Sequence, residues 1–171
     1  MKKKIISILG STGSIGLTSL SIIDKKAKYF EINILSANKN YRLICSQIKK
    51  YKPKLFVIND KRIYEKLKKR YKNINISNNF NFKSLNKKSD ITITAIPGIA
   101  GLQPTLSIIK YSKKILIANK ESIICGWELI RKESSKFKTN IIPIDSEHFS
   151  ILKLIKNRNL KEIKKIYITA S

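Results

Sequence analysis

The stretch Ile5-Ile-Ser-Ile-Leu-Gly10-Ser-Thr-Gly13-Ser-Ile-Gly16 runs from apolar residues directly into three glycines with the spacing Gly-x-x-Gly-x-x-Gly. The apolar run predicts a strand, and the following segment, Ile15 to Asp24, has the periodicity of a helix. Glycines in this position allow a tight turn, a close approach of backbone to pyrophosphate and close helix packing, while N–H groups at the helix start face the phosphate charge. The stretch predicts a dinucleotide-binding turn; an ordinary glycine-containing turn is the alternative.

The alternation of strand and helix patterns continues along the chain. The expected strands are 5–9, 32–37, 55–58, 91–95, 115–118 and 140–144, and the expected helices are 15–24, 41–51, 63–71, 102–111 and 123–137. Apolar strands separated by helix-length connections favour an α/β fold with a doubly wound, mostly parallel sheet of the Rossmann-like kind. We expect residues 73–89 to form a loop with room for one short helix or strand, and residues 164–171 to form a further strand.

The length of 171 residues and the hydrophobic content of 42% indicate a globular chain with a core of its own. The basic amino terminus is followed by an apolar run that Gly10 cuts short, so it does not read as a signal peptide. No run approaches the roughly 18 apolar residues of a membrane helix. Cys45 and Cys125 form no metal or redox spacing with each other or with His148. We expect a soluble protein of the reducing cytoplasm.

The formal charge of +25 is extreme for this length. Such a charge is typical of proteins that bind nucleic acid or an anionic membrane surface. Here the lysines occur singly and in pairs, as in Lys49-Lys50, Lys68-Lys69 and Lys113-Lys114, without interleaved aromatic residues that would stack on bases. We therefore expect neither a nucleic acid nor a membrane as the partner, although the charge attracts anionic small molecules in a salt-sensitive way.

The residues after the second expected strand bear on which cofactor the turn would hold. Folds that bind NAD usually place Asp or Glu about 20 residues beyond the glycines, where it holds the ribose hydroxyls. Here that region is Ser36-Ala37-Asn38-Lys39-Asn40, which contains no carboxylate and offers the positive charge of Lys39 to a 2′-phosphate. The sequence favours NADPH over NADH; the alternative is that Lys39 is one more surface lysine.

Two further segments carry candidate site residues. Asp145 and Glu147, in a chain with only 11 acidic residues, follow an apolar strand at a spacing that can aim both carboxylates at one point and hold Mg²⁺ or Mn²⁺. Alternatively, Asp145 or Ser146 caps a helix that begins near His148, with Glu147 in its first turn. Asn119-Lys120-Glu121 follows another strand at the ligand-binding edge of the sheet, where Asn119 would also suit a helix cap. His148, the only histidine, decides little alone.

Three motifs in this order resemble one enzyme family. Gly10 to Gly16, Ala118-Asn-Lys-Glu-Ser122 and Pro143-Ile-Asp-Ser-Glu-His148 are similar to segments of 1-deoxy-D-xylulose 5-phosphate reductoisomerase, and the resemblance covers essentially the whole chain. The glycine turn alone occurs in many dehydrogenases, whereas the three motifs together are specific. The family converts its substrate to 2-C-methyl-D-erythritol 4-phosphate, an early step of isoprenoid precursor synthesis, by a skeletal rearrangement followed by hydride transfer from NADPH.

The resemblance implies a role for each motif. The implied cofactor-binding residues are Thr12, Gly13, Ser14 and Ile15 at the NADPH phosphates, Asn38, Lys39 and Asn40 around the 2′-phosphate, and Asn119 and Glu121, which complete the cofactor site. The implied substrate-binding residues are Lys120, Ser146, Glu147 and Ser171. Asp145 and Glu147 would ligate Mg²⁺, Mn²⁺ or Co²⁺, and Glu147 and His148 would be the catalytic residues.

The resemblance also implies a division into an NADPH-binding domain, residues 1–140, and the beginning of the metal- and substrate-binding catalytic domain, residues 141–171. The family's third metal carboxylate, most of its substrate-phosphate ligands, its mobile loop and its carboxyl-terminal helical domain have no counterpart before Ser171. We therefore expect an incomplete chain that is inactive alone, and a homodimer for the full-length enzyme. Asn38 stands where the family often has glycine. The alternative is a non-catalytic NADP-binding module from a degraded gene.

Overall fold

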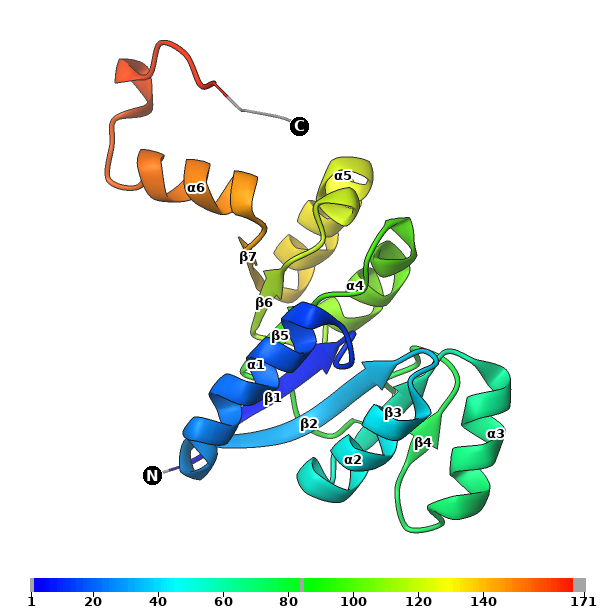
Figure 1. Ribbon diagram of the computed structural model, residues 1–171. Coiled ribbons are helices and arrows are strands. Elements are labelled where there is room, and N and C mark those ends of the chain that lie inside the picture. Colours follow the sequence, from blue (N-terminus) through cyan, green and yellow to red (C-terminus); the bar gives the residue numbers. More distant parts are fainter. Residues whose placement is uncertain (1, 84, 168–171) are drawn as a thin grey trace.

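The computed structural model describes residues 2–83 and 85–167, in which the strands form a single twisted sheet (Figure 1). Within these ranges seven strands pair in the order β4-β3-β2-β1-β5-β6-β7, and every pairing is parallel. The strands are β1 Lys4–Leu9, β2 Phe30–Ala37, β3 Leu55–Ile58, β4 Ile76–Ser77, β5 Ile91–Thr94, β6 Lys114–Ile117 and β7 Asn140–Pro143. The expected α/β fold with a doubly wound parallel sheet is confirmed.

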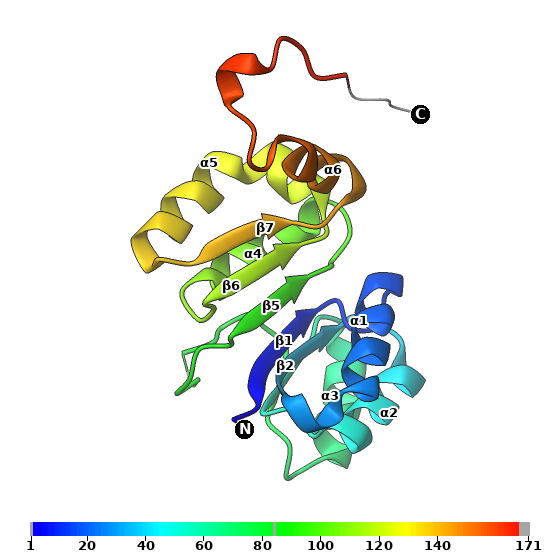
Figure 2. The ribbon, with the colours of Figure 1, turned by 90° about the vertical axis from the view of Figure 1, so that its left-hand side faces the viewer.

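The described helices lie against the two faces of the sheet, except the last one, which lies beyond the carboxyl end of β7 (Figure 2). They are α1 Ser14–Lys25, α2 Tyr41–Tyr51, α3 Lys61–Arg70, α4 Leu102–Ile109, α5 Lys120–Phe137 and α6 Ser146–Ile155, with 3-10 turns η1 Ala27–Tyr29, η2 Ile99–Gly101 and η3 Leu160–Glu162. The helices α1, α2 and α3 pack on one face, and α4 and α5 pack on the other. The change of face follows the return of the chain from β4 to β5, which pairs with β1 and so creates the switch point at the centre of the sheet.

Alternating strand residues supply a core on each face. On one side Ile8 of β1 packs in a cluster with Leu20 of α1 and Ile48 of α2. On the other side Leu9 belongs to a cluster with Ile108 of α4. Each fully buried side chain of this size stabilises the fold by about 1.5–3 kcal/mol relative to an exposed one. Because both cores reach the ends of the central strands, they fix the positions of the turns that follow β1 and β5.

The segment 73–89 has more order than its composition suggests. It contains the expected short element, β4, and continues in side-chain turns: Asn79 Oδ1 accepts a hydrogen bond from the Asn81 N–H, and Asn81 Oδ1 accepts one from the Lys83 N–H, each at 3.1 Å. Asparagine favours such turns because its side chain replaces the missing backbone partner two residues on. The turns deliver Phe82 to the core beneath β1.

Two expectations near the carboxyl end have different outcomes. The strand expected at 164–171 is wrong for residues 164–167, which are exposed and irregular, because a strand needs a paired neighbour and, within the described part of the chain, β7 is the edge of the sheet. Residues 168–171 lie outside the described residues. β7 crosses the expected domain division at residue 140 and pairs with β6, so the sheet continues through that point. The division itself stays a prediction.

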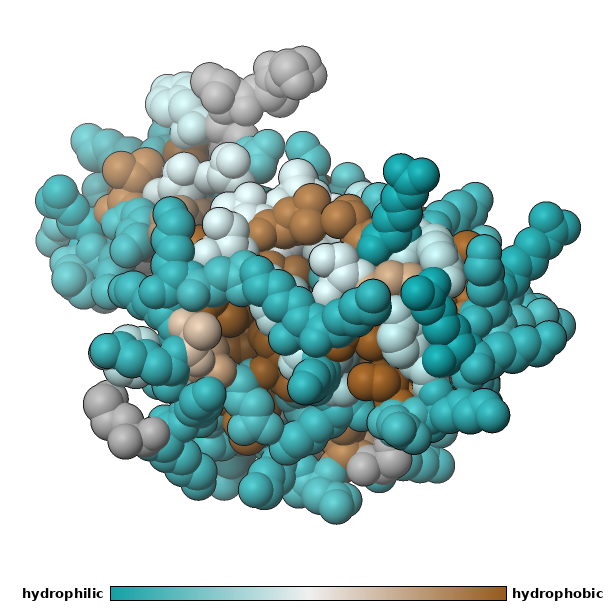
Figure 3. All heavy atoms as spheres, turned by 60° about the horizontal axis from the view of Figure 1, so that its bottom comes forward, coloured by the Kyte–Doolittle hydropathy of each residue, from teal (hydrophilic) through white to brown (hydrophobic). Residues whose placement is uncertain are grey.

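The basic side chains lie on the outer surfaces of the fold. Figure 3 shows long hydrophilic side chains projecting over one face, with apolar surface visible between them. In α3 the basic residues of the last turn, Lys68, Lys69 and Arg70, are exposed, whereas Leu67 beside them is fully buried. Among the described helices, none combines the length and apolar character needed to cross a bilayer.

Candidate functional site: a dinucleotide cleft that ends at two carboxylates

The glycine turn joins the end of β1 to α1, and its three glycines serve different ends. Gly10 has a φ of +90°, and a Cβ there would lie 2.6 Å from the Ala95 carbonyl oxygen. A Cβ at Gly16 would overlap the Gly10 oxygen and lie 2.7 Å from Ser11 Cα. Gly13 has an ordinary φ of −79°, and a Cβ there would meet only the Gly10 oxygen, at 3.5 Å. The fold needs glycine at 10 and 16, whereas at 13 the missing side chain keeps space for a ligand.

A buried polar network holds this turn against β2 and α2. Ser36 accepts from the N–H groups of Gly10 and Ser11 through its carbonyl, at 3.1 and 2.7 Å. The buried Ser11 hydroxyl lies 2.6 Å from Gln47 Oε1, and Gln47 Nε2 donates to the Ser11 carbonyl at 2.8 Å. Sequence reasoning missed Ser11, Ser36 and Gln47, because these contacts join segments 25 to 36 residues apart. The network fixes the amides at the start of α1, where helical N–H groups lack backbone acceptors.

Two hollows flank the turn at the carboxyl ends of the central strands. The first, here called the β2-side hollow, has a volume of about 340 Å³ and lies between the glycine turn, the end of β2 and the segment after β5. The second, the β7-side hollow, has a volume of about 410 Å³ and reaches from the start of α1 to the start of α6. Gly13 and the segment Ala95–Pro97 line both hollows. A ligand that spans them passes directly over Gly13.

The β2-side hollow has the chemistry of an aromatic base site with a polar rim. Phe80, Pro104 and Ala100 give it apolar walls, and Thr12, Asn38 and Asn59 add polar groups. Phe80 and Asn59 were not predicted, because they come from connections that show no motif. Lys39 and Asn40, expected around a 2′-phosphate, are exposed beside this hollow but do not line it. Asn40 caps α2, since its side chain accepts from the Leu43 N–H at 3.1 Å.

The β7-side hollow brings together most of the predicted site residues. Its lining includes Gly13, Ser14, Ile15, Asn119, Lys120, Glu121, Asp145, Ser146 and Glu147. These come from the starts of α1, α5 and α6, which follow β1, β6 and β7 at one edge of the sheet. Asp145 and Glu147 therefore lie at the same edge of the sheet as Gly13 and Asn119. His148 does not line this hollow, and Ser171 lies outside the described residues.

The two carboxylate oxygens of Asp145 have different surroundings. Its Oδ2 accepts from the His148 N–H at 3.1 Å, which caps α6, and lies 2.6 Å from His148 Nδ1. Its Oδ1 is buried and has no hydrogen-bond partner among the described residues. A buried carboxylate oxygen without a partner is costly unless a cation or donor approaches it. Capping and cation binding, which the sequence posed as alternatives, are therefore compatible at Asp145.

Glu147 lies on the first turn of α6, where its side chain is 40% exposed, and its Oε1 is 3.4 Å from Lys120 Nζ. Its own backbone N–H, and then the Lys120 ammonium, lower the pKa of Glu147 below the ordinary value. The carboxylate is thus held ionised beside a positive charge at the mouth of the hollow. Among the described residues no group of three or more His, Cys, Asp or Glu side chains converges on one point. Asp145 and Glu147 fit two ligands of a hard divalent cation, which takes further oxygens from elsewhere.

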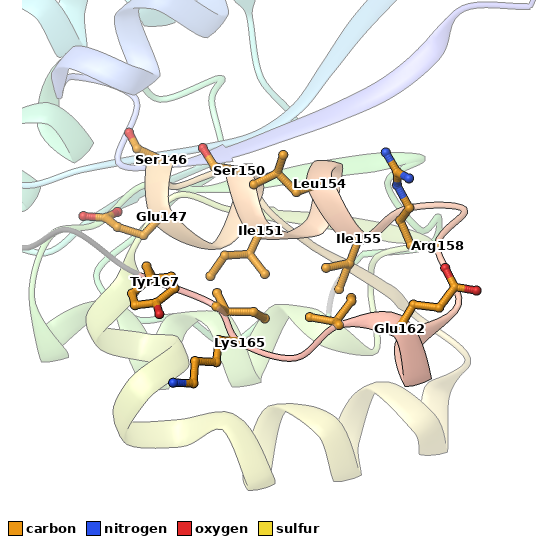
Figure 4. Close-up of a pocket in the computed structure, with 12 residues that line it drawn as sticks. Ser146, Glu147, Ser150, Ile151, Leu154, Ile155, Arg158, Glu162, Lys165 and Tyr167 are labelled. Carbon is orange, nitrogen blue, oxygen red and sulfur yellow. The ribbon is translucent and has the colours of Figure 1, made fainter.

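A larger hollow, of about 740 Å³, lies between α6 and the segment that follows it (Figure 4). Ser146 and Glu147 stand at one end of this hollow, and Ile151, Leu154 and Ile155 line it further along α6. No side chain described on α6 is buried. Among the predicted site residues, this hollow shares only Ser146 and Glu147 with the β7-side hollow.

A parallel sheet with a glycine turn at its switch point, flanked by one apolar hollow and one hollow that ends at carboxylates, defines a Rossmann-type domain of the dinucleotide-binding class. The family model of 1-deoxy-D-xylulose 5-phosphate reductoisomerase matches residues 6–126, which is more than half of the chain. The chain therefore belongs to the 1-deoxy-D-xylulose 5-phosphate reductoisomerase family, as its motifs indicate.

Individual relatives agree with this assignment. The 1-deoxy-D-xylulose 5-phosphate reductoisomerase of Pelagibacter ubique is 48% identical over all of the chain, and that of Clostridium acetobutylicum is 39% identical over 98% of it. The chain spans 45% and 46% of these relatives, or about half their length. Among solved structures, the Zymomonas mobilis enzyme in complex with NADPH matches 86% of the chain, and 40% of its own, with a TM-score of 0.77 and 30% identity.

Proposed function

We propose that the chain supplies the NADPH site and the first part of the metal and substrate site of a 1-deoxy-D-xylulose 5-phosphate reductoisomerase. The reaction converts that phosphosugar to 2-C-methyl-D-erythritol 4-phosphate for isoprenoid precursor synthesis. The observation that carries the proposal is the β7-side hollow, in which the glycine turn, Lys120, Asp145 and Glu147 line one space. A nicotinamide bound over the turn would there face a substrate held at the carboxylates.

NADPH would lie across Gly13, with its adenosine in the β2-side hollow and its nicotinamide in the β7-side hollow. Thr12 to Ile15 surround the pyrophosphate in this arrangement, at the amino end of α1, where the helix dipole favours negative charge. Asn38, Lys39 and Asn40 stand exposed after β2 without a carboxylate among them, so a 2′-phosphate placed there would meet the positive charge of Lys39. A relative solved with NADPH supports the choice of cofactor.

Asp145 and Glu147 would hold Mg²⁺ or Mn²⁺, in keeping with the buried Oδ1 of Asp145, which no described residue hydrogen-bonds. A related reductoisomerase, 28% identical, was solved with NADPH, fosmidomycin and magnesium, and matches 85% of the chain and 37% of its own with a TM-score of 0.75. When bound, such a cation polarises a substrate carbonyl and stabilises oxyanion charge while a carbon–carbon bond migrates. The chain contributes only two carboxylates, so its affinity for the metal alone should be weak.

The remaining residues would orient the phosphosugar. Lys120 extends a positive charge to the mouth of the hollow and keeps Glu147 ionised, while Ser146 offers a hydroxyl at the exposed start of α6. Correct orientation supplies about 7–11 kcal/mol of barrier reduction in favourable cases, so a partly built substrate site loses most of the rate. We infer that residues 1–171 alone do not turn over substrate, and that the complete enzyme is a cytoplasmic homodimer.

The test is an NADPH oxidation assay on two proteins. One is the 171-residue chain, and the other is a fusion in which the chain is followed by the remaining segment of the Pelagibacter ubique relative. We expect substrate- and Mn²⁺-dependent oxidation by the fusion and none by the chain. Glu147→Gln in the fusion should abolish turnover but leave NADPH binding intact. Comparable turnover by the short chain would contradict the proposal, and an inactive fusion that still binds NADPH would favour a non-catalytic NADP-binding module.

A further inference from the structure

The side chain of Asn119 joins two segments that belong to different strand ends. Its Nδ2 donates to the carbonyl oxygens of Ile96 and Gly98, the latter at 2.7 Å. Its Oδ1 accepts from the Ser122 N–H at 2.9 Å, which caps α5. Asn119 is only 4% exposed. Both amide hydrogens and the amide oxygen are therefore committed to the protein itself.

The turn after β5 is shaped to receive this amide. Gly98 has a φ of +68°, a conformation that side chains rarely adopt. At Gly101 a Cβ would overlap Asn119 Nδ2 and lie 2.5 Å from the Ile96 oxygen. The backbone of residues 96–101 thus curls around the Asn119 side chain. An aspartate at position 119 would place a carboxylate oxygen against the two carbonyl oxygens that now accept from Nδ2.

The same turn forms the wall shared by the two hollows, because Ile96 and Pro97 line both. We propose that Asn119 is a positioning residue for the cofactor: it holds the turn 96–101 and so shapes the whole cleft, rather than acting as a side-chain ligand of the nicotinamide half. The proposal rests on the assignment of the cleft to NADPH. Asn119, which the family resemblance implies is a cofactor ligand, would instead support the turn that shapes the cofactor site.

The decisive variant is Asn119→Ser, since serine keeps a helix-capping acceptor but is too short to donate to both carbonyls. Gly101→Ala disturbs the same contact from the other side, and serves if the first variant does not fold. Ser122→Ala is the matched control, because the buried Ser122 hydroxyl has no partner among the described residues. Hydrogen exchange of nucleotide-free protein reports on the turn, where the Gly101 N–H bonds to the Gly98 oxygen.

Loss of two buried hydrogen bonds should speed exchange in residues 96–101 by about tenfold or more in Asn119→Ser, and leave Ser122→Ala unchanged. NADPH and adenosine 2′,5′-bisphosphate, which lacks the nicotinamide half, should both bind about five- to thirtyfold more weakly. Unchanged exchange with weakened NADPH alone would make Asn119 a direct ligand and overturn the proposal. Faster exchange with unchanged affinities would overturn it as well. If the unmodified chain binds neither nucleotide, the proposed function fails, while exchange still decides whether Asn119 holds the turn.

Discussion

The contrast between Gly13 and Gly16 gives a prediction that separates ligand binding from folding. Gly13→Ala adds a methyl group at a φ of −79°, where alanine is unstrained, and at 3.5 Å from its neighbour, the Gly10 oxygen. Restriction of the unfolded chain should then raise the free energy of unfolding by about 0.4–1 kcal/mol, or leave it unchanged. Gly16→Ala forces a methyl group into the Gly10 carbonyl, and should lower the free energy of unfolding by about 1–3 kcal/mol.

Although Gly13→Ala should not destabilise the fold, it should weaken cofactor binding. The methyl of Gly13→Ala enters the space through which a dinucleotide passes between the two hollows, and displaces the pyrophosphate from the amides of α1. Loss of one charge-assisted hydrogen bond costs about 1.5–3 kcal/mol, so NADPH should bind about ten- to a hundredfold more weakly. Urea denaturation and titration calorimetry with NADPH measure the two quantities. If Gly13→Ala binds NADPH as the unmodified chain does, the placement of the pyrophosphate is wrong.

Two further predictions concern charged groups. Lys39→Ala should weaken NADPH binding about ten- to a hundredfold and NADH binding little, whereas Lys49→Ala, which removes the same charge roughly 15 Å away along α2, should change neither in a fluorescence titration. The Ile5 N–H, and then the Lys113 ammonium, lower the pKa of Asp90. The ionised Asp90 carboxylate therefore contributes fully to the free energy of unfolding above its ordinary pKa of about 3.9. This contribution is lost as the pH falls through the lowered pKa of the folded state. Asp90→Asn should cost about 1–2 kcal/mol at pH 7 and progressively less under acid, and a pH-independent difference would argue against this ion pair.

Local patterns sufficed for the fold because each element carries its own signal. The apolar run before Gly10 and the asparagine at 119 mark a strand end and a helix start without reference to the rest of the chain. The parallel order then places both at one edge of the sheet. The strand order likewise places Asp145 near the glycine turn, because both follow parallel strands at the same edge, although they lie far apart in sequence.

The parts that escaped prediction depend on contacts between distant segments. Gln47 looks like an ordinary polar residue of α2 until the fold brings it against Ser11. Phe80 reaches the β2-side hollow from a segment without helix or strand periodicity. The second role of Asn119, as a donor to two carbonyls, depends on the path of the turn at Gly98. Sequence patterns report local preference, and these features arise only from tertiary packing.

The central claim, that this chain holds an NADPH site, is tested most directly by calorimetric titration of the 171-residue protein with NADPH and, separately, with NADH. We predict saturable binding of one NADPH per chain and an affinity for NADH lower by about tenfold or more, because Lys39 meets a 2′-phosphate that NADH lacks. Equal affinities for the two cofactors, or no binding of NADPH by the folded chain, would contradict the account.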